Sequence, residues 1–481
     1  MSLCLKLYLK NLSQLTPNNI KEESLALRRV SLNALEIALN SVEPEKLIQK
    51  NVKIVKDKLI IRNDAFDLST FSEILVIGGG KASAQMALAI EELLKNYPKI
   101  NYKGLVNIPN SLNIKTHSAS SKIKMNLGSH PIPDESGLSG TKMMFNHVEN
   151  TTTDDLIIFL LSGGGSALLP MPKQNISLAD LQATNSLLIA SGASIHEINT
   201  VRKHLSDIKG GSLAKKVYDS SKATVITLII SDVVGNNLES IASGPTVPDL
   251  TTFKDSYDLL EKYQLLNKVP SSVQQLIETG MNDPTLNKPL DIPIYFKKVH
   301  NYLIGSVESS VKTISDYLKK LNFVVDYFSN EIVGEAAVFG EELYKLISHK
   351  LQDFAEKSKK QKIALVGTGE LTVTIKGKGI GGRNQEMLLN FLNDIKDKNI
   401  DYNFIIIGVN LDGIEGNSKA MGALVDNVLL AQIIKNNIDF EDYLKNNDSN
   451  SFFKSLNSEI ITGATGINVN DLLLILIDLH N

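Results

Sequence analysis

The sequence has almost no cysteine and almost no net charge. Its single cysteine, Cys4, excludes a disulfide within the chain and is typical of a reducing compartment. The 50 basic and 53 acidic residues leave a net charge of −3. The chain therefore lacks the excess of basic residues that is typical of a nucleic-acid-binding protein. No apolar run reaches the roughly 18 residues that a membrane-spanning helix needs. We therefore expect a soluble cytoplasmic protein without nucleic-acid or membrane partners.

The N-terminal stretch also lacks the small-residue cleavage site of a signal peptide. Residues 1–15 mix leucine with lysine and favour an amphipathic first helix. A second helix is predicted over 21–40, where the leucines recur at helical spacing. With 481 residues, of which 43% are hydrophobic, the chain can form two or three ordinary globular domains.

Short apolar runs recur along the chain, and most end in glycine or small polar residues. They predict strands at 74–77, 105–108, 156–161, 224–230, 302–304, 363–366, 404–407 and 472–477. Continuous apolar strands that alternate with helices predict an α/β fold with a mostly parallel sheet covered on both faces. Ligands bind at the edge where the strands of such a sheet end, and glycines gather at that edge here.

A proline-rich stretch at 269–293 is the best candidate for a linker between domains. The alternation of strands and helices begins again after it. We therefore predict a larger N-terminal domain over 1–290 and a C-terminal α/β domain over 291–481.

The first glycine-rich loop, GGGKAS at 78–83, follows a strand and precedes a helix. Its glycines, among them Gly79 and Gly80, let the backbone approach a phosphate, and Lys81 supplies a mobile charge. Leu75 stands where a Walker A loop has its first glycine, and Ser83 replaces the third glycine of a dinucleotide fingerprint. A tight packing turn explains the loop equally well.

The second loop, SGGGS at 162–166, follows a buried strand and also suits an anion. We expect binding by Ser162, Gly163, Gly164, Gly165 and Ser166. A hydrolase elbow is excluded because Leu168 takes the place of its last glycine. A flexible turn is the alternative, but a second glycine-rich loop at the same edge favours ligand binding.

Three further segments carry polar side chains suited to a substrate or a metal. His130, in GSHPIPD at 128–134, can orient a substrate, although a rigid surface turn is the alternative. Arg202, in NTVRKHLS at 199–206, has basic neighbours that together suit carboxylate or phosphate, unless they form an ordinary exposed helix face. Asp232 follows a buried strand, a common place for magnesium, although helix capping is the alternative.

The most informative segment is GTGE at 367–370 with GKGIGGRNQE at 377–386. The planar fork of Arg383 suits phosphoryl oxygens. Gly382 and Asn384 are the neighbouring candidates for phosphate, and Glu370 is a candidate for the substrate.

Beyond this segment, Asp412 lies among alternating acids and glycines at 410–416. With Glu415 it can serve a metal or a substrate hydroxyl, but the EF-hand spacing is absent and a turn is the alternative.

Taken in order, nine segments resemble the type 2 glycerate kinase family. They are GGGKASAQMA at 78–87, GSHPIPDESGLSG at 128–140, LLSGGGSALL at 160–169, NTVRKHLSDIKGGSLA at 199–214, SDVVGNNLESIASGPTVPD at 231–249, GTGELTV at 367–373, GKGIGGRNQEMLL at 377–389, LDGIEGNSKAMGA at 411–423 and TGATGINVNDL at 462–472. Each segment alone is weak, whereas nine in fixed order over about 20–480 are specific.

The resemblance implies a cytoplasmic phosphotransferase of carbohydrate metabolism that uses ATP and Mg²⁺ to phosphorylate D-glycerate, with 2-phosphoglycerate as the favoured product. It also implies two α/β domains, the larger one Rossmann-like, with the active site in the cleft between them and a MOFRL region at about 360–478. On this resemblance Lys81 and Arg383 are the best catalytic candidates. Our own hypothesis adds Asp232 as a third, which positions Mg²⁺ or accepts the hydroxyl proton, and takes Asp232 and Asp412 as the candidate metal ligands. A homodimer is a possible assembly.

The chain departs from the family pattern at three acidic positions. Asn236 stands where the family often has aspartate, Glu415 where aspartate is usual, and Lys419 where an acid is common. If those acids help to hold a metal, metal affinity or choice differs here. Three alternatives stay open: phosphorylation at C3, a hydroxypyruvate reductase, which needs the missing dinucleotide fingerprint, and a non-catalytic nucleotide sensor, which would not need Lys81 and Arg383.

Overall fold

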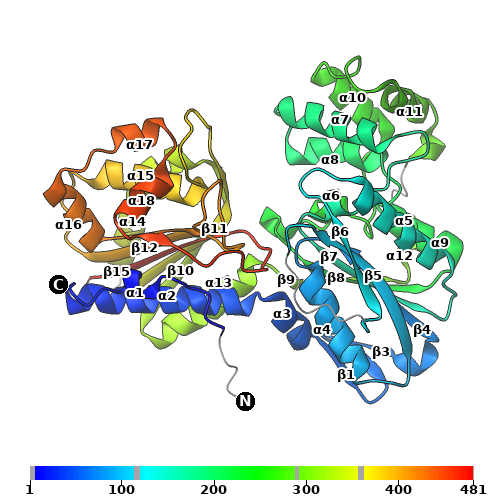
Figure 1. Ribbon diagram of the computed structural model, residues 1–481, viewed down its shortest axis with the longest axis horizontal. Coiled ribbons are helices and arrows are strands. Elements are labelled where there is room, and N and C mark those ends of the chain that lie inside the picture. Colours follow the sequence, from blue (N-terminus) through cyan, green and yellow to red (C-terminus); the bar gives the residue numbers. More distant parts are fainter. Residues whose placement is uncertain (1–5, 113–119, 288–291, 356–361, 480–481) are drawn as a thin grey trace. The chain divides into compact units, whose positions relative to one another are not determined.

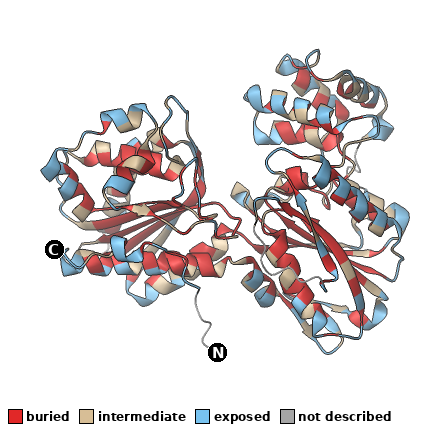
Figure 2. Ribbon diagram, in the orientation of Figure 1, coloured by how far each residue is buried: buried red, intermediate tan, exposed pale blue. Residues whose placement is uncertain are grey.

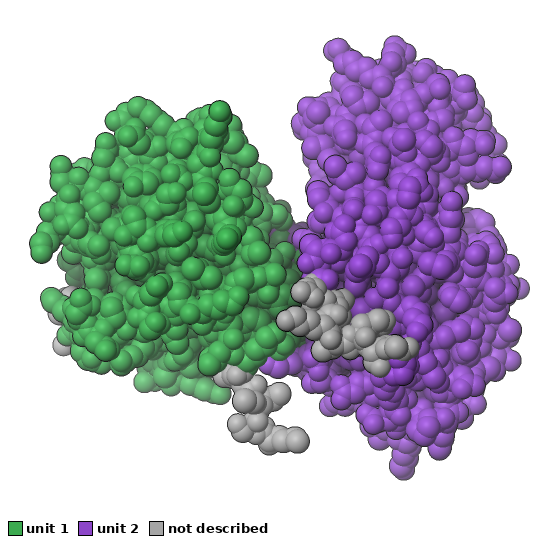
Figure 3. Space-filling model, in the orientation of Figure 1, with its two compact units in different colours: residues 1–43, 306–481 green, residues 44–305 purple. Residues whose placement is uncertain are grey.

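The computed structural model describes residues 6–112, 120–287, 292–355 and 362–479. The chain forms two compact units, shown in Figure 3. Unit 2 comprises residues 44–305, and unit 1 combines residues 1–43 with 306–481. The predicted single division at residue 290 is therefore corrected to two crossings of the chain, at 43/44 and 305/306.

The long helix α2 (Glu22–Ser41) explains why the first 43 residues belong with the C-terminal part of the chain. Its leucines at 25, 32, 35 and 39, predicted to share one face, are all buried. The helix packs on α13 (Val307–Lys320), where the Ser310 hydroxyl donates to the Ala38 carbonyl at 3.1 Å. The guanidinium of Arg28 pairs with Asp426 at 2.6 Å, which fixes α2 to the strand that ends there.

The chain before α2 differs from the predicted first helix. Among the described residues 6–21, only α1 (Leu12–Leu15), a single turn, is helical. The backbone N–H groups of Tyr8 and Leu9 donate instead to the Glu36 carboxylate on α2. A hydrogen bond to a neighbouring helix thus replaces the bonds that a longer first helix would have made within itself.

Unit 2 is built on a six-stranded sheet in which every neighbouring pair is parallel. Its strands are β4 (Glu73–Gly79), β5 (Asn101–Pro109), β6 (Ile123–Gly128), β7 (Leu156–Ser162), β8 (Thr224–Ile230) and β9 (Val299–Gly305). They lie in the order β6-β5-β4-β7-β8-β9, the 3-2-1-4-5-6 order of dinucleotide-binding folds. The predicted Rossmann-like parallel sheet is confirmed.

Helices cover this sheet, and its strands form the buried layer of unit 2 in Figure 2. The helices of unit 2 are α3 (Pro44–Asn51), α4 (Ser83–Lys95), α5 (Glu135–Glu149), α6 (Gly165–Leu168), α7 (Leu178–Ala190), α8 (Ile195–His204), α9 (Ser212–Ser220), α10 (Phe253–Lys262), α11 (Ser271–Asn282) and α12 (Pro293–Phe296), with short 3₁₀ turns η1 (Leu68–Thr70), η2 (Val234–Asn236), η3 (Ile241–Ser243) and η4 (Pro284–Leu286). Strand β7 is buried along its whole length, which is why its sequence is continuously apolar.

Two smaller parts complete unit 2. Strands β1 (Val52–Val55), β2 (Lys58–Ile61) and β3 (Asp64–Asp67) form an antiparallel sheet of their own. Helices α7, α8, α10 and α11 gather into a helical group, visible above α6 in Figure 1, around a separate apolar core that includes Val201, Phe253 and Ile277.

The described residues of the proline-rich stretch at 269–293 belong largely to helices of unit 2 and do not form the predicted linker. Pro270 precedes the first residue of α11, and Pro284 and Pro293 are the first residues of η4 and α12. Proline is tolerated at these positions because the first N–H groups of a helix have no partner within the helix. The prolines therefore mark helix starts, while residues 288–291, which include Pro289, lie outside the described residues.

Unit 1 is built on a second six-stranded sheet, of order β10-β11-β15-β12-β13-β14. Its strands are β10 (Phe323–Glu335), β11 (Lys362–Thr372), β12 (Asn403–Asn410), β13 (Gly422–Asp426), β14 (Glu459–Ile460) and β15 (Asp471–Asp478). Only β10 and β11 are parallel, and every other pair is antiparallel. The sheet of unit 1 is therefore mixed, which the apolar runs did not reveal, because such a run gives no information about strand direction.

The remaining helices of unit 1 are α14 (Ala336–Ala355), α15 (Arg383–Ile395), α16 (Asn427–Asn436), α17 (Glu441–Lys445) and α18 (Ser449–Ser455). The α15 face that includes Met387, Leu388 and Phe391 packs into the core of the unit. In the described part of the chain, no helix has both the length and the apolar character needed to cross a membrane.

Candidate active site

The two glycine-rich loops predicted to bind an anion lie side by side in unit 2. The first follows β4 and the second follows β7, and these strands are neighbours. The Lys81 N–H donates to the Gly163 carbonyl at 2.9 Å, and the Ala82 N–H donates to the Ser162 hydroxyl at 3.0 Å. This point is where the strand order of the sheet reverses, the usual place for a ligand in open α/β sheets.

Close approach of the backbones explains the glycines at two positions in these loops. Gly80 has φ of +145°, and a Cβ there would lie 2.2 Å from the Ser162 hydroxyl. Gly164 has φ of +78°, and a Cβ there would lie 3.0 Å from the His130 ring and 3.2 Å from Cγ of Lys81. His130 and Lys81, which lie 49 positions apart in the sequence, therefore both lie against Gly164.

The chemistry of His130 follows from these neighbours. The surrounding protein strips water from the imidazole, and the nearby charge of Lys81 adds to the effect, so the pKa of His130 falls to about 4. The ring is therefore neutral at physiological pH. It can exchange hydrogen bonds with a substrate, whereas the positive charge beside Gly164 comes from Lys81.

Residues 199–211, which we call the bracket, form hydrogen bonds to two loops of the site, the loop after β7 and the loop that carries η3. Asn199 accepts a hydrogen bond from the Ser243 hydroxyl at 3.1 Å, and the Gly210 N–H donates to the Ser243 carbonyl at 2.9 Å. Lys209 donates through Nζ to the Ser166 carbonyl at 2.8 Å. The bracket thus joins the loop after β7 to the loop that carries η3.

The three basic residues at 202–204 have different environments in the structure. Lys203 is buried and pairs with Asp249 at 3.2 Å. His204 is buried against the Phe253 ring, and its Nδ1 lies 2.9 Å from the Thr200 carbonyl oxygen. Only Arg202 remains partly exposed, with its Nε donating to the Asn185 side chain at 2.8 Å. Of the three, Arg202 alone fits the predicted role in binding an anionic group.

Sequence reasoning missed Ser243. Ala242 and Ser243 are non-glycine residues with φ of 48° and 60°, in the left-handed region that costs on the order of 1–3 kcal/mol per residue. The Ser243 hydroxyl lies 3.0 Å from that of Ser166. Backbone strain that the surrounding bonds maintain is common at functional sites. Its only sequence signal was the run ASG at 242–244.

A second cluster of predicted residues lies in unit 1, at the start of α15. The guanidinium of Arg383 donates to both oxygens of Asp471, with an Nη2–Oδ1 distance of 2.8 Å, and through Nη1 to Glu370 at 2.8 Å. Burial alone would lower the pKa of Arg383, but Asp471 and then the other carboxylates outweigh it and raise the pKa. Glu370, predicted to bind substrate, is here a partner of Arg383.

Glu415 caps α15 and is not exposed to a metal or substrate. Its carboxylate accepts the backbone N–H groups of Asn384 and Gln385, both at 3.0 Å, and the amide of each side chain. Burial, followed by the charge of Asp471, raises the pKa of Glu415 to about 7. A Cβ on Gly382 would lie 2.5 Å from Cγ of Glu415, so this glycine leaves room for the cap.

This cap also changes the expected role of Asn384. Its side-chain nitrogen donates to Glu415 at 2.9 Å and to Asp471 at 3.0 Å, and the residue is buried. The amide predicted to meet a phosphate is therefore used within the protein, where it links the helix cap to the carboxylate that holds Arg383.

The two aspartates predicted to hold a metal are in different units. Asp232 is partly buried just beyond the end of β8 in unit 2. Asp412 lies in a turn of unit 1, where its N–H donates to the Asn410 side chain at 2.9 Å. Among the described residues, no three His, Cys, Asp or Glu side chains are grouped to hold a metal ion.

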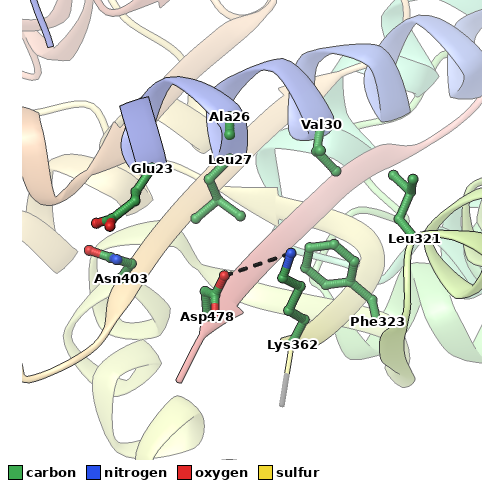
Figure 4. A pocket seen from close by; sticks show the side chains of 9 residues that line it. All are labelled: Glu23, Ala26, Leu27, Val30, Leu321, Phe323, Lys362, Asn403 and Asp478. Atoms are coloured by element: carbon green, nitrogen blue, oxygen red, sulfur yellow. Dashed lines mark ion pairs between the residues drawn. The ribbon is translucent and has the colours of Figure 1, made fainter. Parts of the chain in front are cut away.

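One hollow in unit 1 contains none of the predicted site residues. Figure 4 shows it beneath α2, lined by Glu23, Ala26, Leu27, Val30, Leu321, Phe323, Lys362, Asn403 and Asp478. Lys362 and Asp478 lie 3.9 Å apart across it. Lys362 begins β11 and Asp478 ends β15, whereas Asp471 begins β15. The hollow therefore lies at one end of strands β11 and β15, and Arg383 lies at the other end, beside Asp471.

Two family models match the chain. Residues 30–278 match the domain of unknown function DUF4147, and residues 363–471 match the MOFRL family. The second match falls within the region predicted for MOFRL at about 360–478.

Curated relatives match nearly the whole chain. A glycerate 2-kinase of Pyrococcus horikoshii is 36% identical over 94% of this chain and 98% of its own length. A D-glycerate 2-kinase of Thermotoga maritima is 33% identical over 94% of this chain and 99% of its own length. A crystal structure of a glycerate kinase from Thermotoga maritima superposes with a TM-score of 0.77 at 31% identity, over 94% of this chain and 99% of that one.

One relative has a different name. A putative hydroxypyruvate reductase of Agrobacterium vitis is 34% identical over 84% of this chain and 87% of its own length. This similarity does not restore the dinucleotide fingerprint, which Ser83 interrupts in this chain.

Proposed function

The chain belongs to the glycerate kinase family that joins a DUF4147 domain to a MOFRL domain, and on this premise we propose that it phosphorylates D-glycerate with ATP. The proposed products are 2-phosphoglycerate and ADP, as the names of two relatives suggest. The observation that carries the proposal is the meeting of Lys81, His130 and the two glycine-rich loops at the reversal point of the sheet. We place the enzyme in the cytoplasm, which its single cysteine supports.

Phosphoryl transfer depends on positioning and on neutralising charge more than on covalent chemistry. We propose that Lys81 neutralises charge on the transferred phosphoryl group, with backbone N–H groups of the loops at 78–83 and 162–166 as further donors. Neutral His130 then hydrogen-bonds a substrate hydroxyl, and Arg202 binds the glycerate carboxylate. The left-handed backbone at Gly164 supports this assignment, because any Cβ there would crowd both Lys81 and His130.

Arg383 is proposed to bind phosphoryl oxygens as a second cation of the reaction. Arginine has five N–H donors, and its bonds to Asp471 and Glu370 use three of them. Two donors therefore remain for a ligand on a guanidinium whose orientation is already fixed. Asp471 orients Arg383 in this proposal and does not itself touch the substrate.

The residues present fit a magnesium ion that the nucleotide carries. Mg²⁺ in kinases is usually held by one or two carboxylates together with substrate phosphates and water, so a cluster of three protein ligands is not required. Asp232, partly buried after β8, is the proposed carboxylate in unit 2, and Asp412 is the proposed one in unit 1. The ion would neutralise phosphate charge during transfer.

A coupled assay tests the reaction and its product together. The purified protein receives ATP, Mg²⁺ and D-glycerate, and enolase converts any 2-phosphoglycerate into phosphoenolpyruvate. We expect enolase alone to suffice. A requirement for added phosphoglycerate mutase would instead show phosphorylation at C3, and no ADP release with either enzyme would sink the kinase proposal.

The reductase name of one relative gives a second candidate that the same sample can test. A strand order typical of dinucleotide-binding folds favours it, but the loop after β4 has Lys81 and Ser83 where that fingerprint needs other residues. We expect no oxidation of NADH with hydroxypyruvate. Oxidation of NADH without ADP release from glycerate would favour the reductase.

A further inference from the structure

The described residues include three buried lysine or arginine side chains, and two of them have a carboxylate partner. Arg28 pairs with Asp426 at 2.6 Å, and Lys203 pairs with Asp249 at 3.2 Å. Lys209 is 2% exposed, the most buried of the three. Within the described part of the chain it has no ion pair. Its buried charge is therefore the exception.

The one hydrogen bond of the Lys209 Nζ goes to the Ser166 carbonyl, at 2.8 Å. Ser166 ends the loop whose Gly164 lies against Lys81 and His130. Ser166 and Gly164 are both partly exposed, whereas Gly165 between them is buried. Lys209 thus supports the loop from its buried side, directly behind the surface proposed to receive an anion.

The charges around Lys209 do not balance it. The charged or titratable groups nearby are Arg202 on α8, Lys203 with its partner Asp249 beside Gly210, Asp207 with its partner Lys173, and Lys81 and His130 across Gly164. The nearby carboxylates are already paired with other lysines. Arg202 has the same sign as Lys209 and has no ion pair among the described residues.

An uncompensated buried charge is costly, because the ion loses its hydration and gains no opposite charge in return. Burial, with the like charge of Arg202 as the second cause, lowers the pKa of Lys209 to about 7. The free protein therefore holds Lys209 only partly protonated at neutral pH. An anionic group bound to the loop at 162–166 would favour the protonated form of Lys209 and offset part of the free-energy cost of its buried charge.

We propose that Lys209 is a positioning residue of the active site. It holds the Ser162–Ser166 loop, and an anionic group of the substrate supplies the negative charge that balances the Lys209 ammonium group. The inference rests on the proposed function. The group is a carboxylate or a phosphate, from glycerate or from the nucleotide. Binding of that ligand is accompanied by uptake of a proton at Lys209.

The test measures binding of D-glycerate and of ADP separately, by calorimetry from pH 6 to pH 9. For the ligand whose anion faces Lys209, we expect the affinity of the wild-type protein to fall above pH 7, by up to tenfold per pH unit. We also expect the heat to depend on the ionisation enthalpy of the buffer, which reports proton uptake. A purely structural lysine would produce neither proton uptake nor a fall in affinity above pH 7, because the ADP phosphate, with its last pKa at about 6, can only release a proton when its dianion binds.

Two variants and a control make the result specific. Lys209→Met should bind that ligand at least tenfold more weakly at pH 6 and lose the pH slope, whereas Lys209→Arg should bind well with a flat profile. Lys215→Met, on the neighbouring helix and paired with Asp219, should behave as wild type. If Lys209→Met is poorly folded, Lys209→Arg still decides the question.

The outcomes separate the two proposals. A pH slope that persists in Lys209→Arg, for both ligands, overturns the role of Lys209 and leaves the kinase intact. Failure of the wild-type protein to bind either ligand rejects the proposed function, and the inference falls with it. The ligand that shows the Lys209-dependent slope identifies which anion the loop at 162–166 receives.

Discussion

At the scale of single residues, the two proposed catalytic cations are held in different ways. Arg383 is fixed by Asp471 and Glu370, so little conformational entropy remains to be lost when a phosphoryl group binds. Lys81 is positioned by its backbone, through the bond from its N–H to Gly163, while its side chain extends along Gly164. Arg383 thus depends on one buried carboxylate, Asp471, and one exposed carboxylate, Glu370, whereas Lys81 depends on the shape of two loops.

Replacing either cation should reduce turnover. We expect Lys81→Ala and Arg383→Ala each to lower kcat on the order of 10²-fold or more, because each removes charge that stabilises the transferred phosphoryl group. Steady-state kinetics at saturating ATP and D-glycerate give the measurement. Lys95→Ala, at the exposed end of α4, and Arg29→Ala, on α2, are matched controls that should leave kcat unchanged. Near-normal turnover in both active-site variants would reject these roles.

At the scale of elements, the sequence was sufficient for the strands of unit 2 and for the meeting of its glycine-rich loops. Continuous apolar runs mark buried parallel strands, and loops that follow such strands must share one edge of the sheet. The bracket at 199–211 and the strained turn at 242–244 could not be predicted, because their bonds join residues 33 to 77 positions apart. Local patterns do not report such pairs.

Unit 1 shows the same limit more strongly. The sequence predicted Arg383 as a functional residue but not its partner Asp471, which lies 88 positions away. Glu415 was considered for a metal, and only the geometry of α15 shows it to be a helix cap. The prolines at 270, 284 and 293 lie at helix starts, but their pattern predicts a linker, since proline at a helix start and proline in a loop look alike in one sequence.

A pair of glycines can separate backbone strain from crowding in the loop after β7. Gly164 and Gly192 have φ of +78° and +75°, but a Cβ on Gly192 would meet nothing within 4 Å. Both Gly→Ala changes should cost about 1–2 kcal/mol of stability for the left-handed backbone. Only Gly164→Ala should also displace His130 and Lys81, with an expected fall in kcat/KM of roughly tenfold or more, for a barrier increase of about 1.4 kcal/mol.

Thermal unfolding and steady-state kinetics of the two variants provide the comparison. Equal kinetics in Gly164→Ala and Gly192→Ala would show that the space over Gly164 is not used by the reaction. Equal loss of stability with unequal kinetics is the expected pattern.

At the scale of the whole molecule, the discontinuous unit 1 is the feature that the sequence did not reveal. Hydrophobic periodicity predicted the helix over 21–40 and its buried leucines, but it gave no information about which distant surface the helix covers. The partner of Arg28, at position 426, is 398 residues away. A boundary inferred from composition could only divide the chain once, whereas the chain crosses between units twice.

The ion pair between Arg28 and Asp426 should be a major determinant of the stability of unit 1. We expect Arg28→Met to lower its free energy of unfolding by about 3–5 kcal/mol, because the change leaves a buried carboxylate unpaired. Arg29→Met is the matched control, since the neighbouring Arg29 pairs with Glu22 at the surface and should contribute less than about 1 kcal/mol. Chemical denaturation followed by far-UV circular dichroism suits a chain without tryptophan. Equal midpoints for the two variants would contradict the prediction.

The two crossings of the chain also set an order of events during synthesis on the ribosome. Helix α2 is translated before residues 44–305, and these before every strand that α2 will cover. At about 5–20 residues per second, translation of 44–305 takes roughly 10 to 50 s. Throughout that interval the buried leucines of α2 have no native surface to pack on, while the sheet of unit 2 lacks its last strand, β9, until the interval ends. The nascent helix is therefore a natural client for a chaperone at the exit tunnel.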